Sequence, residues 1–108
     1  MSKIELQDFV KYGSLFETYG KLLSEDRQTI MTDYFEFNMT LAEIAKEKEI
    51  SRQAVLDAIS KSCKKLEEFE SKLHIVEKRQ SLLGELQALR DLTNEELKEK
   101  VENLIRKF

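Results

Sequence analysis

A polar and basic segment between positions 52 and 65 holds the side chains of this sequence that are best suited to binding another molecule. Four cations fall in it against a single acid, Asp57. Arginine and glutamine can each make paired hydrogen bonds with a base edge, and lysine contacts phosphates, so the segment predicts a nucleic-acid interface. The predicted interface comprises Arg52, Gln53, Leu56, Asp57, Ser60, Lys61, Lys64 and Lys65.

Other residue types that carry chemistry occur without the partners that such chemistry requires. His74 is the only histidine and Cys63 the only cysteine, whereas a metal site needs several such ligands, so we expect no metal and no cofactor. We place the acids Glu67, Glu68 and Glu70 on a solvated helix face, because acid–base catalysis needs a pocket that tunes a pKa. With no glycine-rich phosphate loop and no nucleophile motif, we expect no catalytic residue and no enzyme activity.

The composition favours a small helical protein. The chain has 108 residues, of which 36% are charged, with 3 glycines and no proline. Glycine and proline destabilise helix interiors, so their scarcity predicts long helices, and no alternating β-branched run predicts a strand. A single cysteine favours a reducing compartment, and no run approaches the roughly 20 apolar residues of a membrane span. We therefore expect a cytoplasmic protein without membrane insertion.

Two helix N-termini can be located in the middle of the chain. Thr40 and Glu43 have the spacing of a capping box, and Ser51 is a typical N-cap before the next apolar run. A short and a long helix that cross over a tight turn form a helix-turn-helix, and Ala45 is small enough for the crossing. We predict this motif at residues 40–66, with the N-terminal half of its second helix in the major groove of DNA.

The turn of this motif departs from the common pattern. Many such turns have glycine before the apolar turn residue because the backbone there is left-handed, and this sequence has Glu49. A residue other than glycine costs about 1–2 kcal/mol in that conformation. Asn38 is expected to take the same conformation where it ends the preceding helix.

Further helices are predicted on both sides of the motif. Tyr12, Tyr19 and Tyr34 recur at helical spacing and are expected in the core rather than on a stacking platform. The glycine at position 84 is a candidate break within its helix. The predicted helices span about residues 6–21, the segment after the N-cap Ser24, the second motif helix to about 69, about 73–90, and the segment after the capping box of Thr93 and Glu96.

The expected fold is therefore all-α, with a helix-turn-helix domain at residues 1–72 and additional C-terminal helices at residues 73–108. The apolar stripes of the C-terminal helices exceed what one small bundle buries, which favours packing against a second copy in a homodimer. The alternative is that these helices fold back onto the core of their own chain.

Five blocks of the sequence resemble known helix-turn-helix proteins. Three of them are LLSEDRQ at 22–28, LAEIA at 41–45 and ISRQAV at 50–55, and the other two are FETYGKLL at 16–23 and KLEEFESKLH at 65–74. The first three resemble both region 4 of bacterial sigma factors, which is the broader likeness, and the YlxM family of small helix-turn-helix proteins, which is the closer one. The last two resemble the YlxM family specifically, and the similarity covers roughly residues 15–80.

The resemblance implies a sigma region 4-like fold of the winged-helix-like DNA-binding class and a role in the signal recognition particle pathway. The family is associated with that pathway because its genes neighbour those of the particle's GTPase and receptor. Two hypotheses remain open. The chain is a regulator that binds DNA or the particle RNA, or it is a protein-interaction adaptor that modulates a component of the particle.

Overall fold

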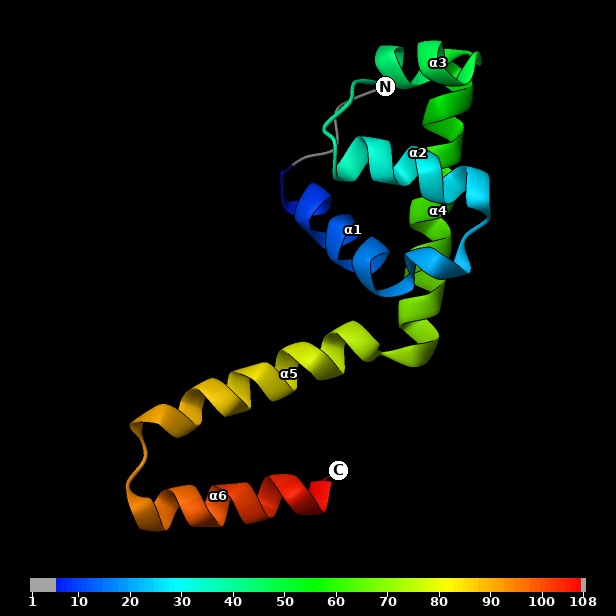
Figure 1. The fold of residues 1–108 in the computed structure, drawn as a ribbon. Helices are drawn as coiled ribbons and strands as arrows, with labels where there is room; N and C mark the ends of the chain where they lie inside the picture. Colours follow the sequence, from blue (N-terminus) through cyan, green and yellow to red (C-terminus); the bar gives the residue numbers. More distant parts are fainter. Residues whose placement is uncertain (1–5, 108) are drawn as a thin grey trace. The chain divides into compact units, whose positions relative to one another are not determined.

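Six α-helices and two short 3₁₀ helices make up residues 6–107, the part of the chain that this computed structural model describes. No β-strand occurs within these residues, so the predicted all-α fold class is confirmed. Phe108 and residues 1–5 lie outside the described part. The helices are α1 Leu6–Tyr19, η1 Gly20–Leu22, α2 Glu25–Phe35, α3 Leu41–Lys48, α4 Arg52–Leu73, α5 Ile75–Ala88, η2 Leu89–Asp91 and α6 Asn94–Lys107 (Figure 1).

The predicted helix caps are confirmed at all four positions. The hydroxyl of Ser24 accepts from the Arg27 N–H, and that of Ser51 accepts from the Ala54 N–H at 3.0 Å. Two complete capping boxes begin α3 and α6. Glu43 N–H donates to the Thr40 hydroxyl at 3.1 Å while Thr40 N–H donates to the Glu43 carboxylate at 3.0 Å. Thr93 and Glu96 make the same reciprocal pair at 3.2 and 3.3 Å.

Among the residues that the structure describes, three other than glycine have a left-handed backbone: Asn38, Glu49 and His74, with φ of 55°, 58° and 55°. The first two were predicted from their places at helix ends. The third was not, because the sequence pattern placed the end of the long helix near Phe69. Instead α4 continues to Leu73, and His74 ends it by donating its N–H to the Glu70 carbonyl.

Two further boundaries differ from the prediction. The first helix ends at Tyr19 rather than near residue 21, and the chain tightens into η1, where a Cβ on Gly20 would lie 2.7 Å from the Phe16 ring. Gly84 does not break α5, which continues to Ala88 before η2. A Cβ at Gly84 would meet nothing within 4 Å, so this glycine sits on an open helix surface.

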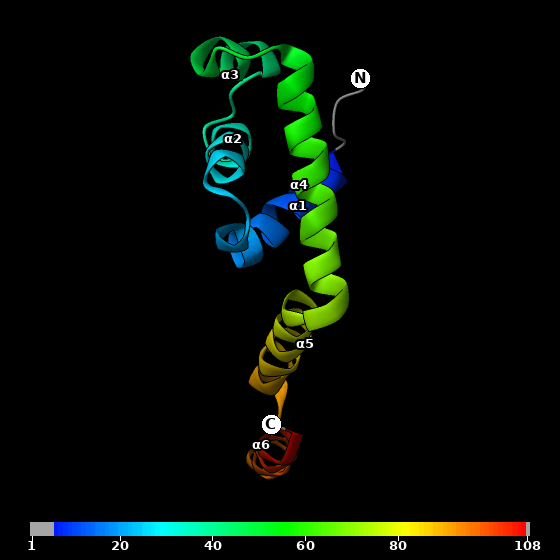
Figure 2. The same cartoon turned by 90° about the vertical axis from the view of Figure 1, so that its right-hand side faces the viewer.

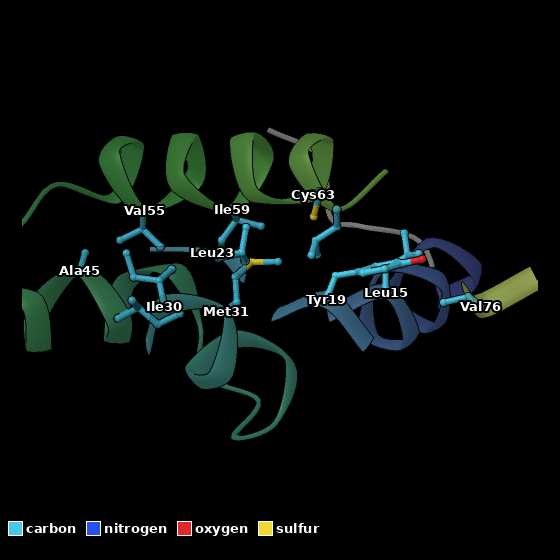
Figure 3. Packing of buried hydrophobic residues seen from close by; sticks show 12 residues of the cluster. Leu15, Tyr19, Leu23, Ile30, Met31, Ala45, Val55, Ile59, Cys63 and Val76 are labelled. Carbon is cyan, nitrogen blue, oxygen red and sulfur yellow. The ribbon is translucent and has the colours of Figure 1, made fainter. Parts of the chain in front are cut away.

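One stripe of α4 forms the centre of the core. The helices α1, α2 and α3 all contact α4, and α3 lies across its N-terminal end (Figure 2). Val55, Ile59 and Cys63 point from α4 towards the other helices, and Met31 of α2 is completely buried among them (Figure 3). Tyr19, 2% exposed, belongs to this core as predicted.

The contacts divide the chain into two units, Met1–Val76 and Glu77–Phe108. The core just described belongs entirely to the first unit, which contains α1 to α4 and the first two residues of α5. The second unit contains the rest of α5 together with η2 and α6.

Candidate nucleic-acid interface

The helix-turn-helix consists of α3, a left-handed turn at Glu49 and α4. The N–H of Ile50 donates to the Ala45 carbonyl at 3.0 Å, which closes the turn, and Ala45 is only 6% exposed at the helix crossing. Ser51 then caps α4, so the first turn of that helix is fixed directly after the turn. This arrangement presents the N-terminal half of α4 as the second helix of the motif.

The buried stripe of α4 determines which of its side chains face outwards. At about 100° per residue, Gln53, Asp57 and Lys64 lie opposite the side occupied by Val55 and Ile59. All three are exposed. Four more residues of the predicted interface are exposed, and Leu56 is half-buried at its edge. The other exposed residues are Arg52, Ser60, Lys61 and Lys65.

The four cations of the interface differ in what they contact. Arg52, Lys61 and Lys64 make no ion pair among the described residues, whereas the Lys65 ammonium lies 3.7 Å from the Glu68 carboxylate. The same ammonium lies 5.6 Å from the centre of the Phe69 ring. The structure therefore leaves three of the four predicted cations without an ion pair within residues 6–107, and only Lys65 is paired locally.

Gln53 and Asp57 are joined to each other one helical turn apart. The Gln53 amide donates to the Asp57 carboxylate at 3.0 Å. A glutamine amide has two N–H donors and one acceptor oxygen, so Gln53 keeps one donor and its acceptor for a base edge. Asp57 therefore orients the side chain of Gln53, and its negative charge repels any phosphate that comes near it.

A shallow depression of about 410 Å³ lies beside two of the free cations, Lys61 and Lys64, between α1 and α4. Its Glu67 carboxylate accepts hydrogen bonds from the Tyr12 hydroxyl and from the Lys11 ammonium, the latter at 3.3 Å. The Tyr12 and Lys11 bonds hold the pKa of Glu67 below its usual range. The lining residues are Tyr12, Ile59, Ser60, Lys61, Cys63, Lys64 and Glu67.

This depression was not predicted from the sequence, and the prediction that Glu67 lies on a solvated helix face is wrong. Glu67 and Glu70 are half-buried and bonded to Tyr12 and Tyr19, rather than on a solvated face, and only Glu68 is exposed. Their partners lie more than 50 residues away in the chain, and no local pattern marks such a pair. The tyrosines carry the one usable signal, since buried Tyr hydroxyls usually find a hydrogen-bond partner.

The single cysteine of the chain, Cys63, is buried in the core of the first unit. Burial, together with the nearby Glu67 charge, raises the pKa of the Cys63 thiol to about 12, so the thiol stays protonated at neutral pH. Within residues 6–107 no cluster of three or more histidine, cysteine, aspartate or glutamate side chains could hold a metal ion. Across that same stretch, none of the helices has the length and apolar character that a membrane span requires.

Comparison with known proteins places the whole motif in one family. The family described as "Putative helix-turn-helix protein, YlxM / p13 like", UPF0122, matches residues 6–106. A UPF0122 protein of Fusobacterium nucleatum is 38% identical over 101 residues, which cover 93% of this chain and 98% of that protein. A family member from Bacillus thuringiensis is 37% identical over 103 residues, which cover 90% of this chain and 94% of that protein. Another from Shouchella clausii is 42% identical over 84 residues, which cover 75% of this chain and 77% of that protein. The family match extends past residue 80 into α6, so the chain belongs to the UPF0122 family of YlxM / p13-like helix-turn-helix proteins.

Proposed function

We propose that this protein is a regulator that binds nucleic acid through the exposed side of α4. The observation that carries the proposal is the group of free cations on the second helix of a helix-turn-helix, namely Arg52, Lys61 and Lys64. Arg52, in the first turn, is placed for a base edge, and the two lysines are placed for phosphates further along the groove. Gln53 and Leu56 add a polar and an apolar contact to bases.

The charge of the whole chain makes this a local rather than a general attraction. The net charge is −3, so the body of the protein repels a polyanion, and the free cations of α4 must supply the attraction. Each phosphate that a protein neutralises in duplex DNA releases counterions and adds about −0.9 to the slope of log affinity against log salt. We expect measurable binding at low salt and a steep loss as salt rises.

The family suggests where the regulator acts. The proposed role in the signal recognition particle pathway rests on the association of the YlxM family with that pathway, whereas the family description itself names only a helix-turn-helix protein. The two nucleic acids to test are therefore duplex DNA from upstream of the gene for this chain, and the RNA of the signal recognition particle. The proposed role is binding rather than catalysis, and it takes place in the cytoplasm.

A salt titration with matched variants tests the proposal. Fluorescence anisotropy is measured on both nucleic acids for the parent and for the triple variant Arg52→Ala, Lys61→Ala, Lys64→Ala. We expect the triple variant to bind more weakly and its salt slope to be smaller by about 0.9 for each duplex phosphate that it no longer neutralises. The single variant Lys65→Ala, whose ammonium is already paired, should bind nearly as the parent does.

A second triple variant controls for net charge alone. Lys21→Ala, Lys72→Ala, Lys78→Ala removes three exposed lysines outside the segment of residues 52–65. If both triple variants bind equally, or if the parent binds neither nucleic acid at low salt, the proposal is wrong.

The adaptor hypothesis is the second candidate, and the exposed Asp57 together with the net charge of −3 favours it. In that case the same face of α4 binds the GTPase of the signal recognition particle. The test is co-purification of this chain with the purified GTPase after nuclease treatment, together with the GTP hydrolysis rate. An interaction that survives nuclease supports the adaptor, while no interaction and no change in hydrolysis rate rule it out.

A further inference from the structure

The second unit has apolar residues but no buried core. None of the described residues from 77 to 107 is buried, although α5 and α6 both carry apolar stripes. The half-buried members of these stripes include Leu82, Leu89, Leu97 and Leu104. The most exposed members are Leu83, Leu86, Val101 and Ile105, at 52%, 48%, 38% and 69% exposure.

This exposure follows from the number of helices in the unit. Two helices can cover only one side of each other, whereas a stable bundle surrounds its apolar positions on several sides. Leu83 and Leu86 are three residues apart and Val101 and Ile105 four apart, so each pair shares one face of its helix, and exposed apolar faces of this kind typically mark a protein interface. The surface formed by Leu83, Leu86, Val101 and Ile105 is hereafter the hairpin seam.

The charges of α6 identify which partner fits the seam. Its first turn carries Glu95 and Glu96, and its last turn carries Arg106 and Lys107. The two cations pair with Glu102 and Glu85 of their own chain, but both side chains remain more than half exposed and can attract further acids. Two copies of α6 that run antiparallel bring the acidic end of each against the basic end of the other. Two parallel copies would instead place like charges opposite each other, which is unfavourable.

We infer that the hairpin seam binds the hairpin seam of a second copy of this chain, with the two α6 helices antiparallel. The product is a two-fold symmetric four-helix bundle, in which the hairpin seam of one chain packs against the hairpin seam of the other. The apolar side chains of the seam become its core and the charged ends of α6 fix the direction of pairing. This inference rests on residues 77–107 alone and does not depend on nucleic-acid binding.

The first test is the mass of the full-length chain in solution. Sedimentation equilibrium should give twice the chain mass of 12.7 kDa for the parent over a range of concentrations. The double variant Val101→Glu, Ile105→Glu should shift the mass to that of the monomer. Leu22→Glu is the matched control, since Leu22 is a 59% exposed leucine of the first unit, and it should leave the dimer intact.

A monomeric parent overturns the inference, as does a double variant that dimerises like the parent. Dissociation by Leu22→Glu would place the interface elsewhere and also overturns it. Circular dichroism shows whether the double variant keeps its helices. If it does not, the charge variants below decide the question.

The second test reverses charges and leaves the seam unchanged. One variant carries Glu95→Lys and Glu99→Lys, which spares Glu96 and its capping box, and the other carries Arg106→Glu, which spares the ion pair between Lys107 and Glu85. Each variant alone should dimerise more weakly than the parent, because an antiparallel pair then brings like charges together. An equimolar mixture should recover the dimer as a heterodimer. If the parent dimerises no more tightly than either variant, the antiparallel pairing is wrong.

Discussion

The hydroxyl of Tyr19 donates a hydrogen bond to the carboxylate of Glu70, which lies 51 residues further along the chain. The same hydroxyl accepts from the Ile75 N–H at 3.1 Å, and the Glu70 carboxylate accepts from the Val76 N–H at 3.1 Å. The free N–H groups at the start of α5 are therefore capped by side chains from α1 and α4. This arrangement compensates for the absence of a Ser, Thr, Asp or Asn cap before Ile75.

We predict that Tyr19→Phe loosens this junction and leaves the packing of the ring intact. The variant removes the acceptor of the Ile75 N–H and one donor to Glu70, so the amides of residues 75 and 76 should exchange about three- to tenfold faster. Hydrogen exchange measured by NMR reads these amides individually. Tyr34→Phe is the control, because the Tyr34 hydroxyl has no hydrogen bond among the described residues. Equal exchange in both variants would contradict the capping role.

The junction also shows which features could be predicted from sequence. Helix caps depend on residues within a few positions of each other, so Thr40, Ser51 and Thr93 were identified correctly from spacing alone. The cap at the start of α5 was not, because it depends on Glu70 and Tyr19, which meet across the fold. A local pattern contains no information about such a distant partner.

The candidate interface on α4 also has features that the sequence predicted and one that it did not. Sequence predicted which residues lie on α4 and that they would be polar, because the alternation of buried and exposed positions follows the helical period. It could not separate Lys65 from Lys61 and Lys64. That separation depends on the local partners that each ammonium reaches, Glu68 and the Phe69 ring in the case of Lys65.

The left-handed turn leads to a second prediction. Glu49 has φ 58° and ψ 41°, a conformation that costs an L-residue about 1–2 kcal/mol and costs glycine nothing sterically. Glu49→Gly should raise the free energy of unfolding by about 1 kcal/mol, once the extra entropy of glycine in the unfolded chain is subtracted. Urea denaturation measures the change. Glu49→Ala removes the same side chain but keeps the Cβ, so a similar gain in that control would show that strain is not the cause.

The glycines at positions 20 and 84 should respond in opposite directions to the same substitution. Gly20→Ala places a Cβ 2.7 Å from the Phe16 ring, which stacks on Phe35, and should destabilise the first unit by about 1–3 kcal/mol. Gly84→Ala meets nothing and should stabilise α5 by about 0.5–1 kcal/mol, because alanine favours helix interiors. Hydrogen exchange with mass spectrometry reads the two units separately. A destabilised α5 in Gly84→Ala, or an unchanged first unit in Gly20→Ala, would refute the packing described for that glycine.

The bond between Tyr12 and Glu67 predicts a loss of stability at alkaline pH. This bond and partial burial raise the pKa of Tyr12 well above its unfolded value of about 10. A pKa that is higher in the folded state gives stability that is complete below the unfolded pKa and is lost as pH rises above it. The urea midpoint of the parent should therefore fall as the pH rises above about 10, towards the folded pKa, and the midpoint of Tyr12→Phe should fall less steeply. Lysines also titrate in this range, so the comparison is repeated in a Lys11→Gln background. If parent and Tyr12→Phe midpoints fall in parallel there as well, ionisation of Tyr12 is not coupled to folding.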